Sequence, residues 1–150
     1  MRVSEIIAHK GSAVETIEHG QPVREAARLM NRKRVGAVVV VNADSRRPMG
    51  MVSQAEIVAA VDELGQSALG HCATGVMRRP VPHCSPETLI QDAMATMTRE
   101  RARHLAVLDG QGGMVGLVSL GDLVAARLSA FELEASVLRD MARTQLLVTS

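Results

Sequence analysis

Two short motifs place a hydroxyl and a carboxylate three residues apart: Ser53 with Glu56, and Ser119 with Asp122. At the start of a helix this spacing forms a capping box, in which the serine oxygen accepts from an early N–H group and the acid reaches back. The same groups can bind a polar ligand, because a carboxylate accepts two hydrogen bonds and a helix N-terminus offers unpaired N–H groups to an anion. Capping is the commoner role of one such motif, and it does not exclude a ligand.

The two cysteines each follow a histidine, in His71-Cys72 and His83-Cys84. Neighbouring side chains on a strand point to opposite faces, so an extended pair cannot easily ligate one metal ion. Two cysteines are also too few for a disulfide framework. We therefore predict free, partly buried thiols and no metal site.

Motifs typical of several enzyme classes are missing. The chain has no Gly-x-Ser-x-Gly elbow, P-loop, Gly-rich dinucleotide fingerprint or His-Glu-x-x-His zinc motif, and its acids show no pairing typical of acid–base work. The sequence predicts a protein that is not an enzyme, with no catalytic residues.

The two serine–acid motifs belong to a longer internal repeat. Shifting the chain by 67 residues places 25–42 on 92–109, and one residue less in the following turn aligns Gly50–Glu56 with Gly116–Asp122. The identical pairs are Ala26/Ala93, Met30/Met97, Arg32/Arg99, Arg34/Arg101 and Val40/Val107.

Both copies predict the same order of elements. Apolar residues at i, i+3, i+4 and i+7 mark one helix face in each copy. Apolar runs at 38–41 and 105–108, each followed by a polar or Gly-rich turn, predict strands. Segments 49–52 and 114–118 return as second strands of hairpins, and each leads to a serine that begins another helix. The helix-face residues are Val23, Ala26, Ala27 and Met30, and Ile90, Ala93, Met94 and Met97.

The expected fold is α/β (α+β), with two tandem modules packed pseudo-symmetrically, each a small mainly antiparallel sheet with two helices. Neither half carries enough apolar surface to enclose a core alone, so the halves should pack face to face and leave clefts. The expected boundaries are 1–64 for the first module, 65–72 for a linker, 73–128 for the second module and 129–150 for a C-terminal helix and tail.

The C-terminal segment 128–141 keeps helical spacing through Leu133, Val137, Leu138 and Met141. We interpret it as a helix that packs across a dimer or presents a face to a partner protein. The alternative is a helix that simply covers the exposed core of its own module.

The repeat length, the element order and the paired Gly-hydrophobic-hydrophobic-Ser-x-x-acid motifs resemble the cystathionine-β-synthase (CBS) domain family. The likeness covers roughly residues 3–128, and tandem copies make it far more specific than a single copy. VSEII and GAVVVVN are similar to the family's first module, and GVMRRPV, RARHLAVLD and GLVSLGD to its second. The chain as a whole resembles a stand-alone bacterial-type CBS-domain protein.

This resemblance implies a ligand such as AMP, ADP, ATP, NAD or another adenosyl compound, for example S-adenosylmethionine, with no cofactor required. It also implies that two such pairs form a homodimer. In the family pattern the acid binds ribose hydroxyls and the serine lies near ribose or phosphate, which assigns Ser119 and Asp122 to one cleft and Ser53 and Glu56 to the other.

The resemblance also implies which segments frame the adenine. They are the backbone around Thr16 and His83, and the starts of the first hairpin strands at Gly36-Ala37 and Arg103-His104.

Glu56 departs from the aspartate that the family usually has at this position. Its extra methylene moves the carboxylate by roughly an ångström or more, which is large against hydrogen-bond tolerances, so the pattern favours the Asp122 cleft. Arg103 and His104 could meet phosphate, since arginine offers a fixed fork of donors. Arg99, Arg101 and Arg103 could equally form a solvated basic edge.

The composition of the chain excludes some classes of binding partner. With a net charge of +1, the chain lacks the positive electrostatic potential that holds nucleic acids, and with Phe131 as its one aromatic residue it lacks rings on which bases could stack. No apolar run approaches the roughly 20 residues that span a bilayer, so we expect no membrane partner and a cytoplasmic location. The sequence predicts a regulatory homodimer that senses an adenine nucleotide and acts on an unknown effector protein in trans. The alternative is a ligand-free dimerisation adaptor.

Overall fold

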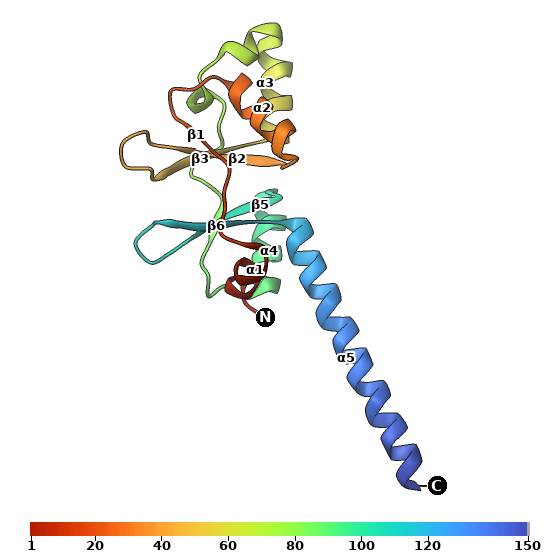
Figure 1. Ribbon diagram of the computed structural model, residues 1–150. Helices are drawn as coiled ribbons and strands as arrows, with labels where there is room; N and C mark the ends of the chain where they lie inside the picture. Colours follow the sequence, from red (N-terminus) through yellow and green to blue (C-terminus); the bar gives the residue numbers. More distant parts are fainter. Residues whose placement is uncertain (150) are drawn as a thin grey trace.

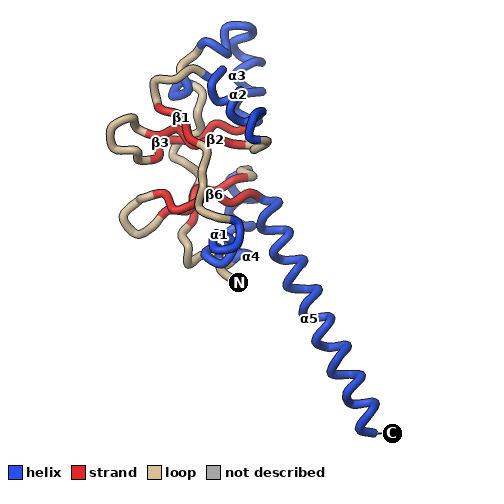
Figure 2. Tube along the Cα trace, viewed as in Figure 1, coloured by secondary structure: helices blue, strands red, loops and turns tan. Residues whose placement is uncertain are grey.

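Two small sheets occupy the middle of the molecule, with helices above and below them (Figures 1 and 2). The computed structural model describes residues 1–149, so Ser150, the end of the expected tail, lies outside the described residues. Each sheet combines one parallel and one antiparallel pairing. The strands, in sheet order, are β1 (Thr16–Glu18), β2 (Ala37–Val41) and β3 (Pro48–Ser53), then β4 (His83–Cys84), β5 (His104–Leu108) and β6 (Met114–Ser119).

The expected repeat is present in three dimensions. Ala37 pairs with Ser53 in the first hairpin, and His104 pairs with Ser119 at the matching position of the second. The helices are α1 (Val3–Lys10), α2 (Val23–Lys33), α3 (Gln54–Leu64), α4 (Ile90–Glu100) and α5 (Leu120–Thr149). The α/β fold with two small modules and a C-terminal helix is therefore confirmed.

The core has three parts. One lies inside the first module and one inside the second. The third joins the two sheets face to face, through side chains from β2, β3, β5 and β6 that include Val39, Met51, Ala106 and Leu117. The β-branched strand residues alternate between these parts, since Val38 and Val40 face the first module's core while Val39 faces the other sheet. This alternation explains why all five residues of β2 are buried.

The segments that lead into the two sheets are exchanged between the modules. α1 precedes the first sheet, yet Val3 and Ile6 belong to the second module's core. The short 3₁₀ helix η2 (Ala73–Gly75) precedes the second sheet, yet Ala73 and Met77 belong to the first core. The boundary at residue 64 thus divides the sequence repeat but does not divide the packing.

Two matching glycines allow this exchange. A Cβ at Gly116 would lie 2.5 Å from the Ile7 side chain, and a Cβ at Gly50 would lie 2.6 Å from Met77 and 2.7 Å from the Arg78 carbonyl oxygen. Real Cβ contacts are essentially never this short. The glycine that begins each Gly-hydrophobic-hydrophobic-Ser motif therefore lets the exchanged segment lie against the hairpin.

Two connections take a definite form in the structure. Within the linker, Gly65–Gly70 forms a 3₁₀ helix, η1, with Ala68 buried. The last helix of the second module and the C-terminal segment form one helix, α5, which runs without interruption for 30 residues from Leu120. No proline or glycine follows Gly121 to stop this helix. Within residues 1–149 no helix is long and apolar enough to cross a membrane.

Candidate functional site: a cleft between the two modules

A cavity of about 740 Å³ opens between the modules beside the start of α3. Its walls come from the first module's serine–acid motif and from the loop that joins α4 to β5 in the second. Five of the ten residues predicted from the sequence line it: Gly36, Ser53, Glu56, Arg103 and His104. The remaining lining residues are Met51, Gln54, Ala55, Val58, Ala59, Asp62, Arg78, Pro82, Arg101 and Ala102.

Ser53 and Glu56 form a capping box at the first turn of α3. The Glu56 carboxylate accepts from the Ser53 backbone N–H at 2.8 Å and from its hydroxyl at 2.7 Å, through the same oxygen, Oε1. The Gln54 N–H donates to the Gly36 carbonyl at 3.3 Å, which ties the helix start to the loop before β2. The longer glutamate is thus accommodated by folding back on Ser53, and it remains half-buried at the cavity wall.

The opposite wall is basic. Arg78 donates to the carbonyl oxygens of Arg101 and Glu100, at the C-terminal end of α4, where unpaired carbonyls attract cations. Arg101 has a left-handed conformation with φ of 53°, so the chain leaves the helix there and turns into β5. This turn brings Arg101 and Arg103 to the same cavity wall.

His104 lies between the two modules. A Cβ at Gly36 would be 2.9 Å from its ring carbon Cε1, so the imidazole packs directly on the Gly36 backbone. Burial lowers the pKa of His104, and the positive charge of Lys10 lowers it further, while Asp122 and Glu56 act in the opposite direction. Among the described residues, its Nδ1 is the only buried side-chain nitrogen or oxygen without a hydrogen-bond partner.

The second serine–acid motif is also a cap, but its acid has an additional partner. Asp122 accepts from the Ser119 backbone N–H at 2.9 Å, and its own N–H donates to the Ser119 hydroxyl at 3.1 Å. Lys10, from the last turn of α1, donates to the Asp122 carboxylate at 2.6 Å. Partial burial by itself would raise the pKa of Asp122, but the hydrogen bonds from Lys10 and Ser119 outweigh it and hold that pKa below its usual value.

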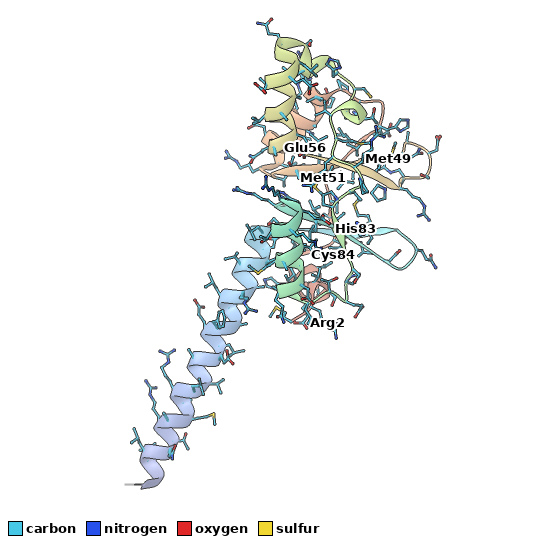
Figure 3. The ribbon with its side chains drawn as sticks, turned by 180° about the vertical axis from the view of Figure 1, so that it is seen from behind. Arg2, Met49, Met51, Glu56, His83 and Cys84 are labelled. Atoms are coloured by element: carbon cyan, nitrogen blue, oxygen red, sulfur yellow. The ribbon has the colours of Figure 1, made fainter. Side chains whose placement is uncertain are left out.

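Three other predicted residues lie away from the large cavity. The Thr16 hydroxyl accepts from Arg46 at 3.4 Å, and Thr16 is not among the residues that line the cavity. Ala37 is fully buried in the core between the sheets. His83 is exposed and lines a different depression, next to Cys84; Figure 3 shows both on the second module, with Glu56 and Met51 on the first.

Two residues near the motifs were missed by the sequence reasoning. Lys10 is 112 residues from Asp122 in the chain, and no local pattern connects the two. Arg78 lies in GVMRRPV, which the repeat places at the start of the second module, but its contact with the end of α4 depends on the exchanged packing.

The cysteines are separate from this cavity. Cys84 is buried, and burial raises its thiol pKa to about 11, whereas Cys72 is exposed. Within residues 1–149 no three histidine, cysteine or acidic side chains come together as metal ligands would.

Comparison with known proteins relates this architecture to others. The family model for the CBS domain matches residues 3–63 and 73–129. The CBS domain-containing protein YhcV of Bacillus subtilis is 30% identical over 116 residues, which cover 77% of this chain and 80% of that protein. Both the repeat and its position along the chain therefore match.

Solved structures agree. The CBS-domain protein ATU1752 of Agrobacterium tumefaciens has a TM-score of 0.78 with 31% identity, covering 84% of this chain and 98% of that one. The CBS domain protein PAE2072 of Pyrobaculum aerophilum, whose structure is a complex with AMP, has a TM-score of 0.76 with 26% identity, covering 90% and 99%. With two module matches spanning most of its length, this chain belongs to the CBS-domain family, as a tandem pair of CBS modules.

Proposed function

We propose that this CBS pair is a non-catalytic sensor of an adenine nucleotide, acting as a homodimer in the cytoplasm on an effector protein in trans. The ligand occupies the cavity beside Glu56. The observation that carries the proposal is the cavity itself, because carboxylates from one module and arginines from the other face the same space. Its volume is within the range of about 300–1,000 Å³ that small-molecule sites have.

The chemistry of the walls suits a nucleoside phosphate. The Glu56 carboxylate has a second oxygen that can accept from ribose hydroxyls while Oε1 remains in the cap. Arg101 and Arg103 offer planar forks of donors to phosphate. His104 supplies a buried nitrogen whose hydrogen-bonding capacity a ligand would satisfy. The bound AMP of the Pyrobaculum relative supports the same ligand class here.

The internal repeat gives two candidate ligand sites, one at Glu56 and one at Asp122, and the charged groups beside these two acids differ. At Asp122 the ammonium of Lys10 already holds the carboxylate, so a ligand there would have to displace it. No such ion pair forms at Glu56, as far as residues 1–149 show. We therefore place the stronger site at Glu56, although the family's usual aspartate is at the other position. Thr16, His83 and Ser119 remain candidates for the second cleft.

Exposed apolar side chains support the homodimer. Val58 and Val61 on α3 are 68% and 51% exposed, and Val124, the counterpart of Val58 in the repeat, is 39% exposed on α5. A second copy that covers these side chains would remove apolar surface from water.

The test is thermal unfolding with adenine and guanine compounds, comparing wild type with Glu56→Gln and Asp122→Asn. Glutamine keeps the capping geometry but loses the charge. A ligand at about a hundred times its dissociation constant should add about 2.7 kcal/mol of stability. We expect adenine compounds to give this shift in wild type and Asp122→Asn, and a much smaller one in Glu56→Gln.

Other outcomes change the assignment. A shift lost only in Asp122→Asn would move the site to the second cleft. Sustained turnover of the nucleotide by pure protein would contradict the non-catalytic assignment. No shift with any compound would favour the alternative, a ligand-free dimerisation adaptor, for which the Lys10–Asp122 ion pair already closes one acid to ligands.

A further inference from the structure

The apolar side chains of α5 continue far beyond the core to which its first turn belongs. Leu123 is fully buried in the second module, whereas Leu128, Phe131 and Leu138 are 55%, 53% and 62% exposed. Figure 1 shows this part of α5 projecting away from the two modules. An isolated helix gains little from such a surface, so a partner that covers it would stabilise it.

The spacing of these side chains identifies the kind of partner. Alternating steps of four and three residues give one continuous seam, which is the pattern of the a and d positions of a coiled coil. The seam consists of Val124, Leu128, Phe131, Ala135, Leu138 and Ala142.

Charges on both sides of the seam specify a second copy of this chain. In a parallel coiled coil, a residue at position g faces the e position five residues later on the other helix. Arg127 would then face Glu132 of the second copy, and Glu134 would face Arg139 of the second copy. Both pairs have opposite signs, and the two-fold axis generates each pair twice.

The other apolar stripe of α5 does not meet these conditions. It runs through Ala130, Leu133 and Val137, and the next step of three residues brings Asp140 into its centre. A buried carboxylate there would have to lose its water without a partner, which costs free energy. The seam through Leu128 and Leu138 is therefore the better-matched interface.

We propose that residues 124–142 of α5 form a parallel, in-register coiled coil with the same segment of a second copy. The two CBS pairs then lie at the same end of the helical stalk. This arrangement is independent of ligand binding, so Glu56→Gln should leave it intact even if no nucleotide binds.

Cysteine cross-linking in the full chain tests orientation and register. The background is Cys72→Ser, because Cys72 is exposed while Cys84 is buried with a thiol pKa of about 11. Under mild oxidation, Ala135→Cys and Ala142→Cys should each give a disulfide-linked dimer, since parallel in-register helices place every seam residue opposite itself.

The matched control is Ser136→Cys, one residue outside the seam, which should give little dimer. Antiparallel helices bring a residue opposite itself at only one level, so cross-linking at 135 or 142 but not both would overturn the proposal. Cross-linking at 136 as strong as at 135, or at none of the three positions, would also overturn it.

Exchanging the charges of Glu134 and Arg139 tests whether the partner helix is a second copy of this chain. Glu134→Arg alone, or Arg139→Glu alone, places like charges across the seam twice and should raise the dissociation constant by about tenfold in sedimentation equilibrium. The double variant restores opposite signs and should return it to near the wild-type value. Arg143→Glu, which lies outside the seam, should change it little.

A double variant no better than either single change would overturn the proposal. So would a chain that stays monomeric in all these variants and in wild type, which would leave the seam for a different protein.

Discussion

At the scale of single residues, the His104 imidazole interacts electrostatically with charged groups of both modules. Its imidazole is partly buried, packs on Gly36, and interacts with Lys10 and with both motif acids, Asp122 and Glu56. Because burial lowers its pKa below the ordinary 6.5, the unfolded chain takes up a proton more readily than the folded one. The stability that this residue contributes is therefore present above pH of about 6.5 and declines as pH falls through that value toward the lower folded pKa.

We predict that wild type loses more unfolding free energy between pH 7.5 and 5.5 than His104→Gln does, as measured by urea denaturation. The other histidines contribute equally to both proteins. The lowered pKa of Asp122 acts below about pH 3.8, outside this window. Equal losses in the two proteins would show that the His104 imidazole titrates as freely in the folded chain as in the unfolded one.

At the scale of elements, α1 has a structural role in a module to which it does not belong in sequence. Val3 is fully buried in the second core, and the backbone of α1 is bonded to the loop before α4, through Val3 N–H to Thr88 O and Ser4 N–H to Pro86 O, both at 2.9 Å. We predict that Val3→Ala lowers the free energy of unfolding by about 2 kcal/mol, because it removes two buried methyl groups and leaves a cavity.

The control for this prediction is His9→Ala, on the exposed side of the same helix, which should change stability by less than about 0.5 kcal/mol. Chemical denaturation of the full chain measures both. Similar small effects for the two variants would mean that α1 is not held in the second core in solution.

At the scale of the whole molecule, the exchanged segments and the shared core make each module depend on the other. The first core includes Met77 from beyond residue 64, and the second includes Ile6 from before it. We therefore predict a single cooperative unfolding transition in calorimetry, with equal calorimetric and van't Hoff enthalpies. Two resolved transitions would show that the modules fold as separate units.

The sequence by itself determined the elements and their order. Residues 23–30 and 90–97 fall on helix faces, and 38–41 and 105–108 form strands, because these patterns depend on a residue's near neighbours and on one buried side. The two serine–acid motifs were found for the same reason, since a capping box is a contact across three residues. The sequence predicts the C-terminal helix only in part. Its helical spacing is visible, but no glycine or proline after Gly121 marks the point where α5 leaves the core of the second module.

Only the tertiary structure shows what lies beside each acid. Lys10 reaches the Asp122 carboxylate from 112 residues away, and Glu56 lines a cavity of about 740 Å³ together with Arg101 and Arg103. The periodicity of apolar residues predicts which side of a helix or strand is buried, but it does not predict which other segment packs against that side. The exchange of α1 with the segment around Met77 therefore had no signal in the repeat, because it depends on which core each segment completes in the folded chain.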